Sequence, residues 1–374
     1  MRIGIDCRMY SSRFTGIGRY VYELTHNLFE IDRKNEYVLF FNEPEYSLFT
    51  EPGPNVKKRL VNAPHYSFSE QTKFLRKINR EHLDVMHFTH FNRPIFYNHP
   101  SIVTIHDLTL SFYPGKKLTS PWHRFAYHLA IRTAVKKAKK IIAVSENTKK
   151  DLQNLFKIKE EKINVIYEGV NSQFRVLQDK AIVENIRKKY KLEKPYLLYT
   201  GVWRSHKNLP NLIKAFNVLK TDYGFDGYLV ITGRKDPVYA PDIENETLSL
   251  ELGNDIIFTG LVDDSDLIAL YNGSLAYVFP SFYEGFGLPP LEAMQCGVPV
   301  VASNTSSVPE VCGDGNAVFF DPNSPEDMAI NIFEVISQKS LRQKLITRGL
   351  QRARQFSWSK MAEATLKLYT EVKS

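Results

Sequence analysis

The sequence predicts an α/β protein of two domains, each built around a parallel sheet. Three observations lead to this prediction. Short apolar runs with strand character alternate with helical segments along the whole chain, an order that is typical of parallel sheets covered by helices. This order is interrupted in a charged stretch near the middle and then starts again with a new strand. The chain also has 374 residues, more than the ~250–300 residues that one core normally organises.

The first half opens with the strand Arg2–Asp6, followed by a loop and a helix near Gly18–Phe29. Residues Trp122–Lys139 have helical periodicity, with an apolar face that basic residues interrupt. Ile163–Tyr167 closes this half. Further strands are expected at short apolar runs, namely Tyr37–Phe41, Val85–Phe88, Ile102–Ile105 and Ile141–Val144.

The second half follows a charged stretch, Gln173–Lys194, which has little strand character and is expected to hold the linker and a helix. Its predicted elements are the strands Tyr196–Thr200, Tyr228–Thr232, Ile256–Thr259, Tyr277–Phe279 and Pro299–Ala302 and the helix Leu209–Lys220. We therefore expect a first domain over residues 1–172 and a second over residues 173–356. Ligands of such sheets bind at the carboxyl ends of the strands, so we expect the active site in the cleft there.

Composition indicates a folded cytoplasmic protein. The three cysteines are an odd number without metal-ligand spacing, which favours a reducing compartment without structural disulfides. The chain begins directly with a strand, so no signal peptide is expected. No apolar run approaches the ~18–20 residues that a membrane-spanning helix needs.

The net charge of +8 is concentrated in the first half. Residues 1–180 contain 29 Lys and Arg against 18 Asp and Glu, and the remainder contains 20 against 23. Residues 116–150 alone contain ten basic residues and one acidic residue, Glu146. This pattern fits attraction to an anionic membrane surface, such as the inner face of the cell membrane, or simply solvated lysines. No nucleic-acid-binding motif accompanies the charge, so a nucleic-acid partner is not expected.

The most informative segment is Phe279–Met294, with the sequence FPSFYEGFGLPPLEAM. It leaves a strand, passes a Gly-x-Gly turn and enters a helix at a Pro-Pro pair, which suits the first helical turn. Glu284 is expected in the loop and Glu292 in the first turn. Backbone amides and the helix dipole suit a phosphate, and the two carboxylates suit sugar hydroxyls. A nucleotide-sugar fits this pattern, although a Glu in a first turn can also simply complement the dipole.

This segment resembles the Glu-x7-Glu motif of glycosyltransferase family 4, retaining enzymes with the GT-B fold. In that fold, two Rossmann-like domains with parallel sheets face each other across a cleft. The resemblance covers nearly the whole chain, and it implies that Glu284 contacts the donor sugar and that Glu292 binds the ribose hydroxyls. It also implies that residues 357–374 form a last helix that crosses back onto the first domain. The intervening backbone, implied to contact sugar and phosphate, belongs to Gly285, Phe286, Gly287 and Leu288.

The loop Gly201–Asn208 follows the first strand of the second half and contains Arg204 and Lys207. Two cations in a strand-to-helix turn suit a diphosphate. The loop is similar to the family's phosphate clamp, so both residues are implied to neutralise the leaving nucleoside diphosphate. Lys207 matches the family pattern well. Arg204 matches the subgroup with Arg-x-x-Lys-Asn spacing, whereas in other members the Arg directly follows the Gly. The alternative is that Arg204 and Lys207 are simply exposed cations of a loop and bind no ligand.

Two segments of the first half also resemble the family's site. Thr15–Tyr20 is a Gly-rich turn before a helix, in which Gly16 and Gly18 are implied to face the donor phosphate and the acceptor. His106 follows a strand and is implied to lie near the reacting sugar. A histidine at a strand end is also often just a satisfied structural group.

Gly233 and Val262 follow two later strands and are similar to the residues that hold the nucleobase in the family. No Asp-x-Asp pair stands where a nucleotide-sugar metal site needs one, since Asp263 and Asp264 are adjacent. With Arg204 and Lys207 to neutralise the diphosphate, we expect metal-independent chemistry without a further cofactor.

Taken together, these residues predict a retaining hexosyltransferase that uses a nucleotide-diphosphate sugar. The loop Gly201–Asn208 resembles that of bacterial mannosyltransferases acting on lipid-linked glycans. This resemblance implies GDP-mannose as the first candidate donor and a UDP-hexose as the second, with a glycan or lipid-linked acceptor in polysaccharide or lipopolysaccharide biosynthesis. A nucleotide-sugar epimerase, an enzyme that extends a soluble glucan and a non-catalytic binding module remain as alternatives. An epimerase would form its product without an acceptor. Competition between a glucan and a lipid-linked acceptor would identify an enzyme that extends a glucan. A non-catalytic binding module would release no nucleotide.

Overall fold

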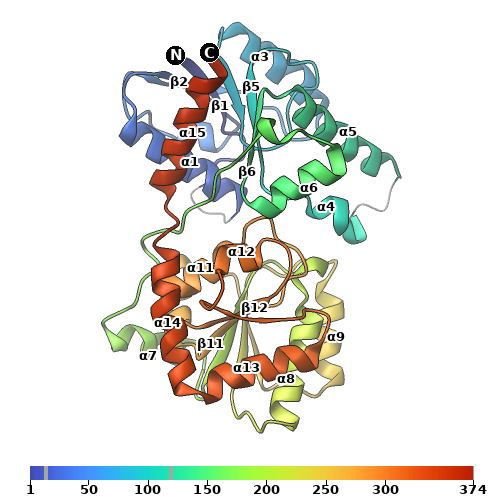
Figure 1. Cartoon of the computed structure of the whole chain (residues 1–374), viewed down its shortest axis with the longest axis vertical. Coiled ribbons are helices and arrows are strands. Elements are labelled where there is room, and N and C mark those ends of the chain that lie inside the picture. Colours follow the sequence, from blue (N-terminus) through green and yellow to red (C-terminus); the bar gives the residue numbers. More distant parts are fainter. Residues whose placement is uncertain (12–15, 118–120, 374) are drawn as a thin grey trace. The chain divides into compact units, whose positions relative to one another are not determined.

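The computed structural model describes residues 1–11, 16–117 and 121–373, which form two compact units (Figure 1). The first unit comprises Met1–Leu108, Leu118–Gly169 and Ser357–Ser374. The second comprises Thr109–Lys117 and Val170–Phe356. The chain thus passes between the units at residue 169, where the sequence predicts residue 172. Thr109–Lys117, which falls within the predicted first domain, packs with the second unit instead.

The first unit is built on a parallel sheet, seven-stranded within the described residues, with the order β3-β2-β1-β4-β5-β6-β7. β1 and β4 are neighbours, so the chain builds outward from β1 in one direction and from β4 in the other. The strands are β1 (Arg2–Asp6), β2 (Glu36–Phe41), β3 (Val56–Leu60), β4 (Val85–Phe88), β5 (Ser101–Ile105), β6 (Lys140–Ala143) and β7 (Ile163–Val165).

The helices of the first unit cover this sheet, and the last helix of the chain is among them. α15 packs against α1, as Figure 1 shows, and a hydrogen bond of 2.7 Å joins Tyr369 Oη of α15 to His87 Nδ1 of β4. The helices are α1 (Ile17–Ile31), α2 (Glu45–Leu48), η1 (Glu70–Phe74), α3 (Leu75–Arg80), α5 (Pro121–Lys137), α6 (Glu146–Phe156), η3 (Glu160–Lys162) and α15 (Trp358–Lys373).

The second unit repeats this plan with a parallel sheet, six-stranded among the described residues, in the order β10-β9-β8-β11-β12-β13. Here the order reverses between β8 and β11, which are neighbours although about 75 residues of chain separate them. The strands are β8 (Tyr196–Thr200), β9 (Tyr228–Thr232), β10 (Ile256–Gly260), β11 (Ala276–Phe279), β12 (Val300–Ser303) and β13 (Val318–Phe320).

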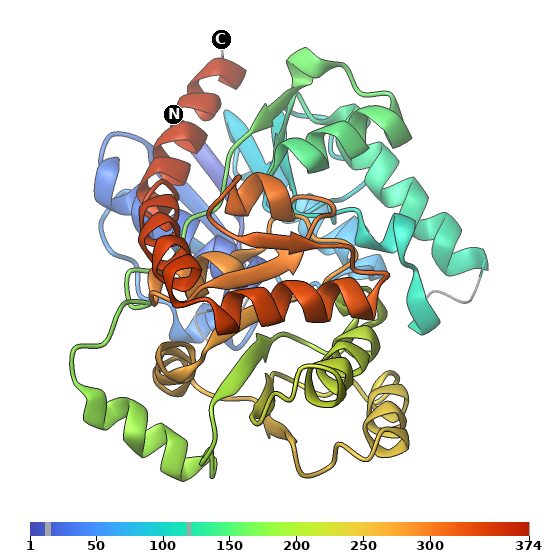
Figure 2. The same ribbon diagram turned by 60° about the horizontal axis from the view of Figure 1, so that its bottom comes forward.

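Helices pack on this sheet through a continuous apolar core that includes Leu197, Tyr199, Phe216 and Ile332. α13 packs on α8 and α14 packs on α11; α13 and α14 are the orange-red helices in Figure 2. The helices are α4 (Thr109–Phe112), η2 (Gly115–Lys117), α7 (Lys180–Lys189), η4 (Ser205–Lys207), α8 (Leu209–Thr221), α9 (Ala240–Ser249), α10 (Asp264–Gly273), α11 (Leu288–Gln295), α12 (Val308–Cys312), α13 (Pro325–Ser337) and α14 (Lys339–Ala353).

Both units therefore have the α/β architecture that the sequence predicts, with parallel sheets covered by helices. In each unit the strand order reverses once, at β1/β4 and at β8/β11. Loops that leave neighbouring strands in opposite directions at such a point open a crevice where ligands of these folds bind. Among the described helices, none combines the length and apolar character needed to cross a bilayer.

Candidate active site

The loops after β8 and β11 bring together two of the predicted site residues of the second unit. Lys207 ends the short helix η4 after β8, and Glu284 lies in the loop after β11. Their side chains meet, with Lys207 Nζ 2.6 Å from Glu284 Oε1, and both are largely buried. Because β8 and β11 pair directly, residues 77 positions apart become an ion pair at the reversal of the strand order. This pair is the centre of the candidate site.

Asn208 holds the Lys207 loop in place. Its backbone is left-handed, with φ of 59°, and its buried side-chain amide donates to the carbonyls of Pro280 (3.0 Å) and Pro322 (2.7 Å). The Phe282 amide donates to the His206 carbonyl at 2.8 Å. The two loops are thus tied together on both sides of Lys207, by a backbone hydrogen bond at His206 and by the side-chain amide of Asn208. Arg204, by contrast, is exposed, and its guanidinium forms no ion pair within the described part of the chain.

Two serines after β12 fix the backbone of the Glu284 loop. Ser306 Oγ accepts from the Glu284 amide at 2.9 Å, and Ser307 Oγ donates to the carbonyls of Glu284 (3.0 Å) and Phe286 (2.8 Å). Neither serine was predicted to belong to the site. Their signal is weak, because it is only a pair of small polar residues shortly after a strand. The carbonyls of Glu284 and Phe286 therefore point toward the Ser307 hydroxyl, which restricts the backbone groups of this turn that can face a ligand.

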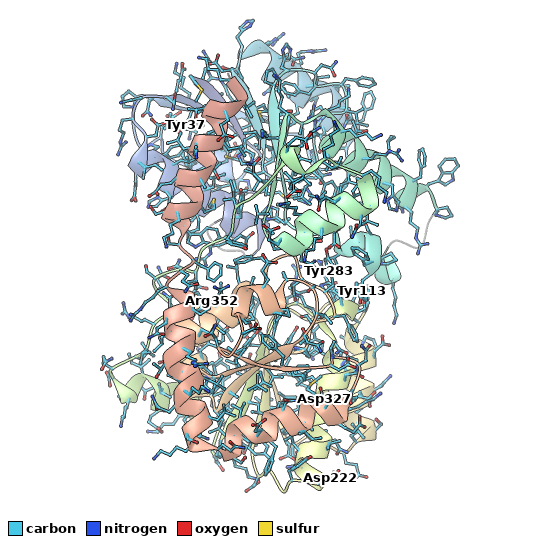
Figure 3. The ribbon with its side chains drawn as sticks, in the orientation of Figure 1. Tyr37, Tyr113, Asp222, Tyr283, Asp327 and Arg352 are labelled. Atoms are coloured by element: carbon cyan, nitrogen blue, oxygen red, sulfur yellow. The ribbon has the colours of Figure 1, made fainter. Side chains whose placement is uncertain are left out.

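The segment Thr109–Lys117 braces the Glu284 loop through aromatic contacts. The rings of Tyr113 and Phe282 stack with centroids 6.1 Å apart, and the ring of Phe112 lies 5.1 Å from that of Tyr283. Tyr113 and Tyr283 also lie close to each other, as Figure 3 shows, with centroids 6.3 Å apart. These contacts explain why this segment belongs to the second unit. They could not be predicted from the sequence, because the two segments lie far apart in the chain.

The helix after the Gly-x-Gly turn begins earlier than predicted. α11 starts at Leu288 with Gly287 as its N-cap, because Gly287 has φ of 101°, a conformation that favours a residue without Cβ. Glu292 therefore lies in the second turn, and the predicted first-turn position is wrong. Complementarity to the helix dipole is correspondingly weak at this distance from the end. Gly285 and Phe286 are buried, while Leu288 is half-buried.

Buried tyrosines surround Glu292. Tyr271 Oη donates to Glu292 Oε2 at 3.2 Å, and Thr200 Oγ1 lies 3.2 Å from Tyr271 Oη and 3.1 Å from Tyr277 Oη. Burial, followed by the charge of Glu292, raises the pKa of Tyr271 well above its usual value. Tyr271 therefore stays protonated and keeps donating to the carboxylate. A carboxylate can accept several hydrogen bonds, so the contact with Tyr271 does not by itself exclude ribose hydroxyls as additional donors.

Gly233 has a structural reason to be glycine. Its φ is 127°, and a Cβ at this position would lie 2.1 Å from the carbonyl oxygen of Gly201. The close approach of two strand-end turns thus requires glycine whether or not a ligand is bound. Val262 is half-buried after β10. The nucleobase roles of both residues remain predictions.

His106 of the first unit is buried with both ring nitrogens engaged. Nε2 donates to the Thr89 carbonyl at 2.9 Å, and Nδ1 lies 3.1 Å from Glu168 Oε1. The ring of Tyr20 packs edge-on at 4.6 Å. Glu168 lies beyond β7, is 6% exposed and was not predicted to contact His106. This geometry fits a satisfied structural histidine, and the predicted role of His106 beside a reacting sugar stays a prediction.

The Gly-rich turn of the first unit precedes α1. Gly16 is the N-cap of α1, and a Cβ there would meet nothing within 4 Å in the described structure. Gly18 is packed closely, since a Cβ would lie 3.1 Å from the Met9 carbonyl oxygen. Thr15 of the predicted motif lies outside the described residues. The predicted approach of a phosphate or sugar to Gly16 stays a prediction, and the close packing at Gly18 is a structural requirement.

A buried ion network occupies the reversal point of the first unit, at β1/β4. Arg8 follows β1, and its fully buried guanidinium contacts Asp6 Oδ2 at 2.8 Å and Glu70 Oε2 at 3.0 Å. It also donates to the carbonyl of Asn92 at 3.1 Å and lies 4.1 Å above the ring of Phe74. Burial alone would lower the pKa of Arg8, but the two carboxylates raise it. Arg8 thus remains charged and joins β1 to the loops around it.

We expect three histidines of the first unit, the buried His87 and the half-buried His65 and His90, to make this unit sensitive to acid. Burial, followed by repulsion from His106, lowers the pKa of His87 to about 3. Burial, followed by repulsion from Arg8, lowers that of His65 to about 4. Burial also lowers the pKa of His90 well below its usual value. These rings are neutral in the folded protein near neutral pH.

We expect His87→Gln to reduce the loss of stability in acid. The unfolded chain binds a proton on His87 below pH ~6.5, while the folded protein does so only near pH ~3, so the free energy of unfolding falls as the pH drops through this window. For one such group the loss between pH 7 and pH 5 is about 2 kcal/mol. The amide of Gln can still bond Tyr369 and Thr104, the present partners of His87. Urea unfolding at both pH values measures the effect, and the exposed His26 provides the control substitution. An unchanged pH dependence in the His87 variant would contradict the assignment.

Within residues 1–11, 16–117 and 121–373, no group of three His, Cys, Asp or Glu side chains is arranged to hold a metal ion. What the second unit offers instead is a lysine, an exposed arginine and two positioned carboxylates at the carboxyl edge of a parallel sheet.

Two parallel-sheet units of this type, with a Glu-x7-Glu loop and a cationic turn in the second, define a glycosyltransferase of the GT-B fold. Comparison with known families agrees. The family described as Glycosyltransferase Family 4 matches residues 14–174, and the family described as Glycosyl transferases group 1 matches residues 182–352. The chain belongs to glycosyltransferase family 4.

Relatives with assigned names lead to the same family. The chain is 32% identical to the O-antigen chain mannosyltransferase B of Escherichia coli over 274 residues, which cover 72% of this chain and 70% of that protein. It is 28% identical to the serotype-specific mannosyltransferase WbdA of E. coli, over 73% of this chain. That match spans only 33% of WbdA, so the matched part of this chain corresponds to about a third of the larger protein.

Solved structures share the fold over the full length. The structure of Anabaena Alr3699/HepE in complex with UDP and glucose superimposes with a TM-score of 0.76 at 17% identity, covering 99% of this chain and 100% of that one. At this level of identity the similarity concerns the fold.

Proposed function

We propose that this glycosyltransferase transfers mannose from GDP-mannose to a glycan or lipid-linked acceptor in the assembly of polysaccharide or lipopolysaccharide. The mannosyl donor is supported by the names of the related O-antigen enzymes. The observation that carries the proposal is the pairing of Lys207 with Glu284 at the reversal of the strand order. It places one group suited to a diphosphate next to one suited to sugar hydroxyls.

In the proposed reaction, Lys207 and Arg204 stabilise the negative charge that develops on the leaving diphosphate. Arg204 is exposed, so its planar donors are accessible to a phosphate. Lys207 is bonded to Glu284 without a ligand, and a bound diphosphate would become a second anionic partner for its ammonium group. These two positive charges make a metal ion unnecessary for charge neutralisation in the proposed mechanism.

Glu284 is proposed to position the donor sugar through its hydroxyls. Because its carboxylate already bonds Lys207, it is oriented by that contact and by the Ser306 contact to its amide. The acceptor hydroxyl would attack on the face from which the diphosphate leaves, with the leaving phosphate accepting the proton. The configuration at the anomeric carbon is then retained without a covalent sugar–enzyme intermediate.

Glu292→Ala should weaken the binding of GDP-mannose by about tenfold to a hundredfold. Charged hydrogen bonds contribute about 1.5–3 kcal/mol each, and the variant would lose those to the ribose hydroxyls. Isothermal titration calorimetry with GDP-mannose measures the change, and Glu334→Ala on the exposed face of α13 is the matched control. Unchanged affinity in the Glu292 variant would contradict the ribose role. Tighter binding of UDP-glucose than of GDP-mannose by the unmodified protein would replace the proposed donor with a UDP-hexose.

A further inference from the structure

One face of α5 exposes large apolar side chains. Trp122 is 79% exposed, Phe125 is 62% exposed and Leu129 is 44% exposed. Their spacing of three and four residues places them on one side of the helix. The opposite side is buried against the sheet through Tyr127, Ile131, Ala134 and Val135. We call the side with Trp122, Phe125 and Leu129 the α5 apolar stripe.

The first turns of α5 project from the body of the first unit, as Figures 1 and 2 show. Tyr127 is the first residue of the helix to be buried, and its ring lies 5.5 Å from that of Phe91. Near the other end, Lys137 Nζ donates to the carbonyl of Ile95 at 2.8 Å. The helix is therefore anchored along its middle and its C-terminal end. The apolar stripe begins before the anchored part.

Basic residues continue the stripe toward the C-terminal end of α5. Arg132 and Lys136 follow Leu129 at the same spacing of three and four residues, and both are exposed. Residues 116–150 contain ten Lys and Arg but only one acidic residue, Glu146. Glu146 lies within 3.6 Å of Lys149, so the acid of this segment is already paired. The stripe thus combines an apolar part with a positively charged part on one side of one helix.

We infer that the α5 apolar stripe and its basic continuation bind an anionic lipid surface. Large exposed aromatics on a folded protein mark a contact site, since Trp and Phe favour the boundary between water and acyl chains. The positive charges of the stripe complement the negative headgroups of an anionic bilayer, which favours a bilayer over a protein partner. A helix with this pattern lies in the plane of the membrane surface, with its cations near the headgroups. This contact would hold the enzyme at the membrane without a spanning helix. It concerns a surface of the first unit and does not depend on the donor proposed above.

The fluorescence of Trp122 can report whether the stripe enters lipid. The chain has three tryptophans, and Trp203 and Trp358 are only 1% and 6% exposed. Transfer of Trp122 into lipid should shift the emission of the protein to shorter wavelength and make it sensitive to brominated acyl chains. The measurement uses the full chain without donor, mixed with vesicles of phosphatidylcholine alone or with phosphatidylglycerol added. Co-sedimentation with the same vesicles gives the partition coefficient.

We expect binding to the vesicles with phosphatidylglycerol, with a blue shift, and weaker binding as salt is added. The double variant Phe125→Ser, Leu129→Ser keeps Trp122 and should lower the partition coefficient at least about tenfold. The variant Arg132→Gln, Lys136→Gln should lower it by about fivefold for each charge at low salt. Leu248→Ser on α9 of the second unit removes a leucine that is 70% exposed and should leave the partition coefficient unchanged.

Absence of binding by the unmodified protein, or equal binding by the double serine variant, would overturn the inference. Equal binding to both kinds of vesicle would overturn its electrostatic part. Circular dichroism establishes that the variants are folded. Calorimetry with GDP-mannose in solution separates the two proposals, because a loss of vesicle binding with intact donor affinity concerns the stripe alone.

Discussion

A Glu284→Gln variant should turn over its donor about a hundredfold to a thousandfold more slowly than the unmodified enzyme. This corresponds to about 3–4 kcal/mol of lost transition-state stabilisation, the usual effect of removing one positioned group around developing charge. Gln keeps the size of the side chain but loses the negative charge. Lys207 then loses its partner at 2.6 Å, and the sugar loses a charged acceptor for its hydroxyls.

Donor affinity should change much less than turnover, because Lys207 remains available to the diphosphate. Nucleotide release with GDP-mannose and acceptor measures the rate, and calorimetry measures the affinity. Asp226→Asn is a matched control, since it removes the charge from another Lys–carboxylate pair of 2.6 Å, Lys194–Asp226. Both members of that pair precede strands and so lie at the amino edge of the sheet, away from the candidate site. Full turnover in the Glu284 variant would remove this residue from the mechanism, and a product of inverted configuration by NMR would refute retention.

Arg8→Ala should lower the free energy of unfolding by about 3–5 kcal/mol, the usual result of removing one partner from a buried charge network. The guanidinium of Arg8 is fully buried between Asp6 and Glu70. Without it, two carboxylates would stay in the interior of the protein without a cation. Burial already raises the pKa of Glu70 in the presence of Arg8. In the variant, Glu70 is therefore the carboxyl group that we expect to take up a proton.

Chemical unfolding followed by circular dichroism measures this loss. Arg33→Ala is the control because Arg33 is exposed, and surface substitutions of this kind usually change stability by less than about 0.5 kcal/mol. The loss in the Arg8 variant should be smaller at low pH, where protonated carboxyls are less costly to bury. A stability equal to that of the Arg33 variant would mean that the network contributes nothing net to the fold.

The strands in the middle of each sheet were predictable from the sequence, but the edge strands β3 and β13 were not. β8 and β9 are nearly continuous apolar runs, because both faces of a parallel strand inside the sheet are covered. β3, with the sequence VKKRL, lies at an edge and carries exposed charge, so it has no such pattern. β13 is an edge strand of three residues, too short for any periodicity. Both were missed for this reason.

The candidate site divides in a similar way. Glu284 and Lys207 were identified from local motifs, and the structure places their side chains in contact. The predicted first-turn position of Glu292 was wrong because Gly287, with its left-handed backbone, starts α11 before the Pro-Pro pair. The supports of these residues were not predictable. They come from distant segments whose side chains, such as those of Tyr113 and Ser307, belong to no motif.

The sequence by itself determined the family, the two parallel-sheet units and the chemical character of the loops, because alternation of apolar runs and the spacing of Gly, Pro, Glu and Lys are local properties. Only the tertiary structure decided which groups meet. Lys207 pairs with Glu284 because β8 and β11 become neighbours where the strand order reverses, and Trp122 is exposed because α5 extends past the sheet that buries its other side. Pairing of strands and burial of a helix face depend on residues far apart in the chain, so no local pattern could specify them.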